Sequence, residues 1–395
     1  MAGSPNRGVL CYFITFTSMA SKKIFGNPKK LRREKERMEA KGDTSFTSVM
    51  AITETCQQNI PQQYVLPRSQ RPNTTLVDQI STSLPVIDLS MLDHPAHRSQ
   101  LILQVHTACN QLGFFQVINH GISTMVMKGA LDSAEEFFDL PSDEKMCFAS
   151  ADVHKPVRYG TSMNHELDQV FYWRDFIKHY ANPISEWIDL WPSSPPTYKE
   201  KMGNYGMLMN LLQKKLIEVV LESLGLNANY LQDDIKEGSQ VMAVNCYPSC
   251  PEPDLALGMP PHTDYGTLTI LNQSHQGLEI MDHEKKWHPV PFIEGALIVQ
   301  LGDQFEVISN GRYKSIPHRA VVNVQKKRFS IASLHSMRLE KKVGPAPELV
   351  DEQNPVAYKE GSFGEFLDYI SVKSPTEGKY MDILKIHERR NVGEV

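Results

Sequence analysis

The sequence has no hydrophobic run long enough to cross a membrane, no strong charge of either sign and few cysteines. Among its 395 residues, no apolar stretch approaches the ~20 residues that a membrane helix needs. A formal net charge of −5 gives no electrostatic reason to expect nucleic acid as a partner. Six cysteines scattered through so long a chain are unlike the framework of a small disulfide-rich domain. We therefore expect a monomer that acts on a small molecule in a reducing compartment, the cytoplasm, with the nucleus as an alternative.

The composition is that of a globular protein, but the first 50 residues depart from it. The sequence is 41% hydrophobic and 22% charged, close to the average for globular domains. In residues 1–50, the block Lys29–Arg37 is mostly charged and offers little to bury. We interpret these residues as a disordered extension, although a basic run can also be a nuclear address or a nucleic-acid patch. The apolar run Val9–Phe16 belongs either to this extension or to a short signal segment.

The spacing of apolar residues predicts strands and helices in an N-terminal region, residues 51–236. Pro85–Leu89 and Phe114–Ile118 are short and apolar like strands, and Ser99–Leu112 between them has helical spacing. A second helix is predicted over Met125–Phe138. The stretch Asn182–Pro196 is rich in Pro, Trp and Ser, which is typical of an irregular connection.

The pattern then changes from helix to strand. Tyr198–Leu224 has one apolar stripe, which predicts a long helix that backs a sheet. Residues 237–338 contain short strand-like runs with frequent Gly, Pro and Asn turns, including Asn310-Gly311, a hairpin signal. Such a region is typical of an all-β sandwich or barrel.

Three residues of this β-rich region have the types and order of a metal site. His262 and Asp264 lie in an extended segment, Pro261–Leu271, in which residues two apart point to the same face. His318 follows in a second strand-like run, which a folded sheet can bring beside the first pair. Two imidazoles and one carboxylate leave one side of a metal open, as in the facial triad of non-haem Fe(II) oxygenases. A zinc hydrolase is an alternative, but it needs a general base, and none is identifiable.

A second pair of residues adds an anion site. Arg328 and Ser330 lie two apart on the strand-like run Arg328–Leu334, so they share a face. A guanidinium there could hold a carboxylate bidentately while the Ser hydroxyl adds a donor. The natural ligand is a small keto dicarboxylic acid that chelates the metal with its other end. Tyr247 and Asn245 are expected to supply further polar contacts.

These residues stand in a series of motifs that resembles the core of the plant soluble Fe(II)/2-oxoglutarate-dependent dioxygenases. The matching stretches are Asn245–Pro251, Leu257-Gly258, His262–Asp264, Gly302-Asp303, Ser309–Gly311, His318-Arg319 and Arg328–Ile331. An N-terminal signature, Leu84–Leu89 and Gly113–Gly121, agrees. Within that family the sequence looks most similar to the flavanone 3-dioxygenase-like and salicylate-hydroxylase-like group.

The resemblance implies a fold, cofactors and a reaction. The implied fold is mainly β with helices (α+β), with a distorted double-stranded β-helix, a jelly roll of the cupin type, as its core. A C-terminal segment, residues 339–395 with a partly helical stretch at Glu365–Tyr369, would cover the pocket. Fe(2+) would bind the three predicted ligands, 2-oxoglutarate the Arg-x-Ser pair, and ascorbate would serve as reductant. The implied reaction is hydroxylation or desaturation of a small plant metabolite, with release of succinate and CO2.

Two positions separate this sequence from the flavonoid-oxidising members of that family. Those members commonly carry an aromatic residue six positions after the Arg and a Lys two before the Asn of the Asn-x-Tyr motif. Here the two places hold Leu334 and Ala243, which removes a stacking face and a phenolate partner. We still expect a flavonoid or other phenolic substrate, with Tyr159, Phe171 and Leu334 as pocket walls.

Several alternatives stay open on the sequence alone. A hormone-directed oxidase of the gibberellin type and an oxidase that uses ascorbate without 2-oxoglutarate would share the fold. A non-catalytic jelly-roll protein that keeps a metal for structure would belong to another class. Cys246 and Cys250 are interpreted as structural thiols, because no second close pair follows to complete a zinc site.

Overall fold

The computed structural model of the chain describes residues 46–55, 58–72, 84–373 and 378–386. Contacts divide the chain after Thr44, and every element described below belongs to the unit that begins at Ser45. The predictions for Val9–Phe16 and for Lys29–Arg37 fall outside the described residues. Within the described part, no helix combines the length and the apolar character that spanning a membrane requires.

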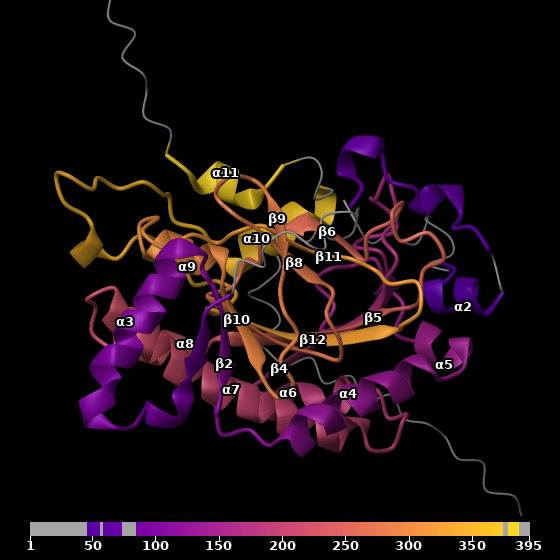
Figure 1. Cartoon of the computed structure of the whole chain (residues 1–395), viewed down its shortest axis with the longest axis horizontal. Coiled ribbons are helices and arrows are strands. Elements are labelled where there is room, and N and C mark those ends of the chain that lie inside the picture. Colours follow the sequence, from indigo (N-terminus) through magenta and orange to yellow (C-terminus); the bar gives the residue numbers. More distant parts are fainter. Residues whose placement is uncertain (1–45, 56–57, 73–83, 374–377, 387–395) are drawn as a thin grey trace, which may run out of the picture. The chain divides into compact units, whose positions relative to one another are not determined.

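The larger of two sheets in the described part has eight strands, visible at the centre of Figure 1. Its neighbouring strands are antiparallel except for the parallel pair β1 and β2. In spatial order the strands are β1 (Val86–Asp88), β2 (Phe114–Ile118), β10 (Leu297–Leu301), β7 (Leu268–Gln273), β12 (Arg328–Ser336), β5 (Ser239–Tyr247), β4 (Asp175–Asn182) and β3 (Val157–Thr161). Both edges come from residues 51–236 and the centre from residues 237–338, so the two predicted regions share one sheet.

A smaller sheet of four strands packs against one side of the larger sheet. Its strands, all antiparallel, are in spatial order β6 (Met259–His262), β11 (His318–Ala320), β8 (Leu278–Met281) and β9 (Trp287–Pro289). Phe114, Leu271 and Ile298 of the larger sheet form one buried cluster with Leu278 and Ile280 of the smaller. Two mostly antiparallel sheets around a shared apolar layer form a jelly roll, which confirms the predicted fold class.

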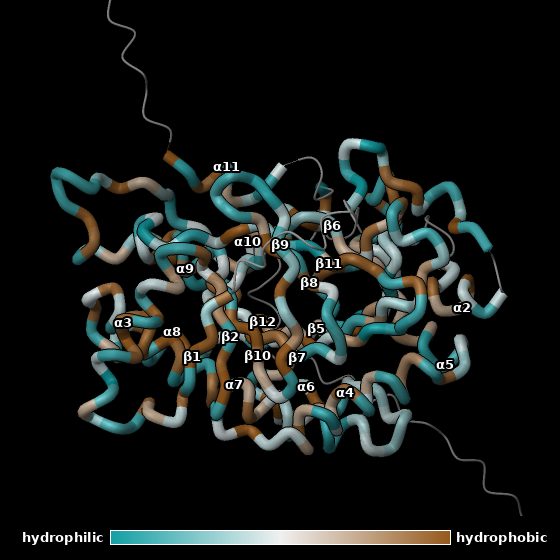
Figure 2. Tube along the Cα trace, viewed as in Figure 1, coloured by the Kyte–Doolittle hydropathy of each residue, from teal (hydrophilic) through white to brown (hydrophobic). Residues whose placement is uncertain are grey.

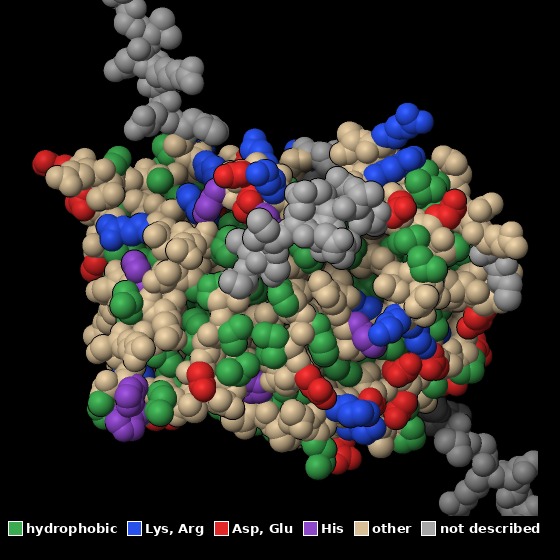
Figure 3. Space-filling view, viewed as in Figure 1, with side chains coloured by type: hydrophobic (Ala, Val, Ile, Leu, Met, Phe, Trp, Pro, Cys, Tyr) green, Lys and Arg blue, Asp and Glu red, His purple; other side chains and the backbone are tan. Residues whose placement is uncertain are grey.

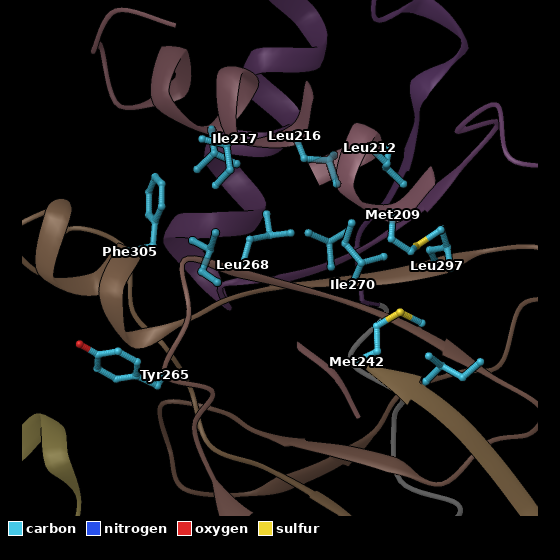
Figure 4. Packing of buried hydrophobic residues seen from close by; sticks show 14 of the residues in the cluster. Met209, Leu212, Leu216, Ile217, Met242, Tyr265, Leu268, Ile270, Leu297 and Phe305 are labelled. Carbon is cyan, nitrogen blue, oxygen red and sulfur yellow. The ribbon is translucent and has the colours of Figure 1, made fainter. Parts of the chain in front are cut away.

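Helices cover the opposite side of the larger sheet. They are α7 (Tyr198–Ser223), which contacts β4, β7 and β12, and beside it α4 (Thr124–Phe138) and α3 (Pro95–Gln111). In Figure 4, Met209 and Leu212 of α7 point toward Ile270 and Met242 of the sheet. Because alternate residues of a strand face opposite sides, these strand side chains form the layer that packs on the helices. The three helices predicted from apolar spacing are all present, the first beginning one turn earlier than predicted.

Shorter helices join these layers. They are α2 (Val49–Glu54), α5 (Ser142–Met146), α6 (Ile184–Trp187), α8 (Gln232–Lys236), α9 (Asp303–Ile308), α10 (Phe363–Val372) and α11 (Tyr380–Leu384), with 3-10 turns at 62–64, 68–70, 89–91, 188–190 and 347–349. In Figure 2, hydrophobic residues gather along β1, β2 and β10. The stretch Asn182–Pro196, predicted to be irregular, in fact contains α6 and a 3-10 turn.

The predicted hairpin at Asn310-Gly311 is wrong. These residues end α9, and the Gly311 N–H donates to the Glu306 carbonyl at 2.8 Å. Their φ angles are 50° and 79°, and such a left-handed conformation closes helix ends as well as hairpins. The dipeptide alone therefore does not distinguish the two structures.

The predicted boundary at residue 50 is also too late. The N–H groups of Val49 and Met50, the first two residues of α2, donate to the two Asp175 oxygens at 2.9 and 3.0 Å. Asp175 begins β4 and is fully buried. The chain is therefore fixed to the larger sheet from the start of α2, because a buried carboxylate needs these donors.

Candidate metal and cosubstrate site

Three side chains from two strands and a loop converge on one point. His262 ends β6 and lies directly across from His318, the first residue of β11. The Nε2 atoms of these histidines lie 3.6 and 3.7 Å from Oδ1 of Asp264, and the two ring centres are 4.1 Å apart. Among the described residues, this is the one group of three or more His, Cys, Asp or Glu side chains close enough to share a metal ion. The structure therefore brings the three predicted ligands together.

Asp264 reaches this point from a loop, because β6 ends two residues before it. The extended segment predicted over Pro261–Leu271 is therefore interrupted, and strand alternation does not place the carboxylate. Backbone contacts hold the loop instead, since the Asp303 N–H donates to the Asp264 carbonyl at 2.8 Å. Gly302 permits this close approach, because a Cβ there would lie 2.1 Å from the Gly266 carbonyl oxygen.

Hydrogen bonds and burial leave the ligand atoms in the state that binds a metal. His262 Nδ1 lies 2.8 Å from the Pro260 carbonyl, which directs Nε2 to the shared point. The Gln300 amide donates to Oδ2 of Asp264, leaving Oδ1 free. Burial and the neighbouring His318 lower the pKa of His262 to about 3, and burial lowers the pKa of His318. Neutral imidazoles and a carboxylate fit a divalent transition metal such as Fe(2+).

On the larger sheet, a buried guanidinium has an unused donor. Arg328 is 5% exposed. Its Nε donates to the His275 carbonyl at 3.0 Å and its Nη2 to the Gln273 side chain at 2.8 Å. Its Nη1 has no hydrogen-bond partner among the described residues. A buried cation without a counter-charge is costly, so this donor fits a carboxylate ligand.

The other predicted contacts share this face of the sheet. Arg328 pairs with Tyr247, and Ser330 with Asn245, across the antiparallel strands β12 and β5, and directly opposed residues share a face. The Asn245 amide donates to the Ser330 hydroxyl at 3.3 Å. The Arg328 guanidinium carbon lies 5.0 Å from the centre of the Tyr247 ring. The structure therefore brings together the four residues predicted to hold a keto dicarboxylic acid.

Sequence reasoning missed the residues that position this set. The Arg174 guanidinium donates to Asn245 Oδ1 at 3.1 Å and contacts Met259 Sδ at 3.2 Å. It thereby links β4, β5 and β6. Gln273 accepts a hydrogen bond from Arg328, and Gln300 donates one to the predicted metal ligand Asp264. No local motif marks these residues, because each contacts a strand far away in the sequence.

Comparison with known proteins places the chain in a family. A model of the 2OG-Fe(II) oxygenase superfamily matches residues 238–336, and a model described as non-haem dioxygenase in morphine synthesis N-terminal matches residues 84–194. Flavanone 3-dioxygenase 3 of Oryza sativa subsp. japonica is 45% identical over 309 residues, which are 78% of this chain and 93% of that protein. The chain belongs to the 2OG-Fe(II) oxygenase superfamily.

Other similar proteins agree with this assignment. Protein DOWNY MILDEW RESISTANCE 6 of Arabidopsis thaliana is 39% identical over 78% of this chain and 90% of its own length. The crystal structure of JOX2 in complex with 2OG, Fe, and JA has a TM-score of 0.77 and 30% identity, and the match covers 87% of this chain and 98% of that one. The chain is therefore an Fe(II)- and 2-oxoglutarate-dependent dioxygenase, which confirms the predicted enzyme class and cofactors. Ascorbate stays a prediction.

In this oxygenase, part of the face that carries Arg328 and Ser330 is accessible. Along β4, β5 and β12, the residues that face the helices are buried, whereas several residues on the other face are half-buried. We call these half-buried residues the site-face patch: Lys178, Tyr180, Val241, Ala243, Ala332 and Leu334. The patch adjoins Asn245 and Ser330 along the same strands, so a substrate that lies on it would be next to the bound cosubstrate.

Of the three predicted pocket walls, the structure brings one to this patch. Leu334 belongs to it. Tyr159 pairs with Ile177, on the helix-facing side, and its ring lies 6.2 Å from that of Phe137 in the core. Phe171 precedes β4 and packs edge-on against Tyr64 at 5.8 Å. Tyr159 therefore lies on the helix-facing side of the sheet, away from the site-face patch.

The C-terminal helix α10 contains the predicted helical stretch and contacts the metal loop. Tyr265, next to Asp264, stacks on Phe366 of α10 at 4.4 Å between ring centres, with 6° between the planes. Asp368 of α10 lies 3.5 Å from His154, in the loop before β3. The helix therefore connects the loop that carries a metal ligand with the loop beside the site-face patch.

Proposed function

We propose that this oxygenase hydroxylates or desaturates an aromatic metabolite of the phenolic class, a flavonoid or a smaller phenol, with release of succinate and CO2. The reaction class is supported by two features together: the His-Asp-His group, and the unused donor of buried Arg328 on the larger sheet. The substrate class is supported by two relatives from rice, which are named flavanone 3-dioxygenases and are 45% and 39% identical to this chain.

We assign roles to the residues as follows. His262, Asp264 and His318 would hold Fe(2+), and Arg328 with Ser330 would bind the distal carboxylate of 2-oxoglutarate. When bound, the metal and cosubstrate together supply the oxidising power drawn from O2. Tyr247 and Asn245 would complete the cosubstrate site from the neighbouring strand.

The positioning residues keep these groups in a single arrangement. Arg174 fixes the orientation of the Asn245 amide, and Asn245 in turn fixes the Ser330 hydroxyl. Gln300 holds one carboxylate oxygen of Asp264 so that the other stays available. Preorganised donors of this kind lower the cost of ordering the ligands when they bind.

The partners we propose are small molecules: the substrate, 2-oxoglutarate and O2, with ascorbate as reductant. On the face shown in Figure 3, acidic and basic side chains are interspersed, and the described residues form no continuous basic stripe there. This distribution supports a small-molecule enzyme over a nucleic-acid-binding protein. We propose that the protein works as a monomer in the cytoplasm.

The proposal is tested by incubating the Fe(II)-loaded full chain with 2-oxoglutarate, O2 and a panel of flavonoids and simple phenols. Products are scored by mass spectrometry for a gain of sixteen mass units, which marks hydroxylation, or a loss of two, which marks desaturation. Succinate should appear in proportion to product. Product formation that does not depend on 2-oxoglutarate would instead support the ascorbate-using alternative, and a panel without any product would overturn the substrate class.

A further inference from the structure

The site-face patch contains a charged residue that the proposed function does not use. Lys178 of β4 pairs with Ala243 of β5, and Ala243 pairs with Ala332 of β12. The three residues therefore form one row across the face that also carries Asn245 and Ser330, which lie two residues away along β5 and β12. Lys178 is flanked by the small Ala243 on β5 and by Arg158 on β3, so the side of its chain toward β5 and β12 has no bulky residue in this row.

Three cationic side chains lie close together on this part of the face. Arg158 of β3 pairs with Lys178, and Arg174 directly precedes β4. The Arg158 and Arg174 guanidinium carbons lie 4.8 and 4.5 Å from the centre of the Phe176 ring, which places this ring near both cations. Three carboxylates act on these cations through space: Asp152, Asp168 and Asp175.

Most donors of the two arginines are already engaged, although Arg158 Nε has no partner among the described residues. Arg158 donates to the carbonyls of Ala151 and Met163 at 3.1 and 3.2 Å. Arg174 donates to the Ser162 carbonyl and to Asn245 at 3.0 and 3.1 Å. These bonds fix both guanidinium groups as parts of the scaffold.

Lys178 is different because most of its hydrogen-bonding capacity is unused. Its ammonium donates to the Val153 carbonyl at 2.5 Å, and an ammonium has three donors. Burial and the nearby Arg158 lower the pKa of Lys178 to about 7, although Asp152 opposes the shift. An acidic group placed beside this amine would therefore offset the repulsion between Lys178 and Arg158, and it would accept a charge-assisted hydrogen bond.

We propose that Lys178 is a specificity-determining residue that binds an ionisable oxygen of the substrate, either a phenol or a carboxyl group. This inference rests on the proposed function, since it assumes that the substrate lies on the site-face patch. The acidic oxygen would contact β4, while the carbon to be oxidised would point away from it toward the His-Asp-His group. Substrates that lack such an oxygen would leave Lys178 unpaired and would bind more weakly.

The test uses the full chain loaded with Mn(2+) and 2-oxoglutarate, titrated by calorimetry with two matched pairs of aromatic probes. Benzoate and benzamide differ in a carboxylate, and naringenin and its fully O-methylated form differ in phenol groups. We expect the native chain to bind the ionisable member of one pair at least about tenfold more tightly. The pair that shows the preference identifies the acidic group.

The variants separate recognition from support of the fold. Lys178→Met should lose the preference and Lys178→Arg should keep it, while the affinity for 2-oxoglutarate stays unchanged in both. Lys128→Met is the matched control, because Lys128 is an exposed lysine of α4 that pairs with Asp132 at 2.6 Å, away from the site face. This control should bind all four probes like the native chain.

Four results would overturn the inference. Equal binding of both members of each pair, or a preference that survives in Lys178→Met, would show that Lys178 does not select the substrate while leaving the proposed function in place. A lower melting temperature and equal weakening of all probes in Lys178→Met would assign Lys178 to holding the Val153 loop. If no probe binds to a protein that still binds Mn(2+) and 2-oxoglutarate, the aromatic substrate class fails as well.

Discussion

The two faces of the larger sheet differ in what they contribute to the molecule. Toward the helices, Ile177, Val244 and Ile331 are fully buried in one apolar layer. Toward the smaller sheet, the same strands place polar residues such as Arg328 and Asn245, also buried. A single strand thus supplies stability with one set of side chains, and the alternate set carries the residues that we propose bind the ligand. Substitutions on the two faces should therefore affect different measurements.

The largest effect is expected from Asp264→Ala, which removes the one carboxylate of the metal group. Turnover, measured as succinate release, should fall to background because Fe(2+) loses a ligand. The melting temperature should change little, since no core contact is lost. The matched control is Asp282→Ala, because Asp282 pairs with His288 at 2.6 Å outside the site. Native turnover in Asp264→Ala would exclude the ligand assignment.

On the other face, Ile331→Ala should reduce the free energy of unfolding by about 2–5 kcal/mol, because it leaves a cavity under the sheet. Urea unfolding followed by circular dichroism measures this change. The dissociation constant for 2-oxoglutarate, determined at a temperature where the variant is folded, should stay at the native value. A large loss of 2-oxoglutarate affinity would show that the two faces are not independent.

In contrast to Ile331→Ala, Arg328→Met should weaken the binding of 2-oxoglutarate without destabilising the fold. Removing the cation should raise the dissociation constant for 2-oxoglutarate by roughly 30-fold or more, the range reported for losing one partner of a buried charge pair. Without ligand, the melting temperature should stay the same or rise, because an unpaired buried charge is gone. Calorimetry measures the dissociation constant, and thermal unfolding of the same sample measures the melting temperature. A lower melting temperature together with native affinity would contradict the assignment.

The smallest effect is expected from Gln300→Leu, which keeps the metal ligands but removes the amide that orients Asp264. Loss of such a supporting hydrogen bond typically lowers metal affinity by about 10–100-fold. Titration with Mn(2+) in the absence of 2-oxoglutarate measures it directly. Affinity equal to that of the native chain would show that the loop backbone alone places the carboxylate.

The parts of the site that could be predicted from the sequence are those marked by residue type. Two histidines, an aspartate and an Arg-x-Ser pair are residue types typical of metal and anion sites, and the structure groups His262 with Asp264 and His318, and Arg328 with Ser330 on one face. The long helix and the jelly roll followed from apolar spacing and from resemblance.

The parts that could not be predicted depend on register. Tyr159 was assigned to the pocket, but a shift of one residue in strand pairing moves a side chain to the other face, and no local pattern fixes that register. Arg174, Gln300 and Lys178 have roles only because strands far apart in the sequence lie side by side. The hairpin predicted at Asn310-Gly311 was wrong for a different reason, because a helix end and a hairpin turn require the same backbone angles.

The strand order of the larger sheet also has a consequence for synthesis. As the chain leaves the ribosome, β2 has β1 beside it and α3 against it, but its other neighbour, β10, is translated much later. In the same way, β7 and β5 cannot be joined until β12, the last strand, is made. The nascent chain therefore exposes unpaired strand edges for most of its translation, a state prone to aggregation. Premature termination before residue 328 would leave two half-sheets with nothing to connect them.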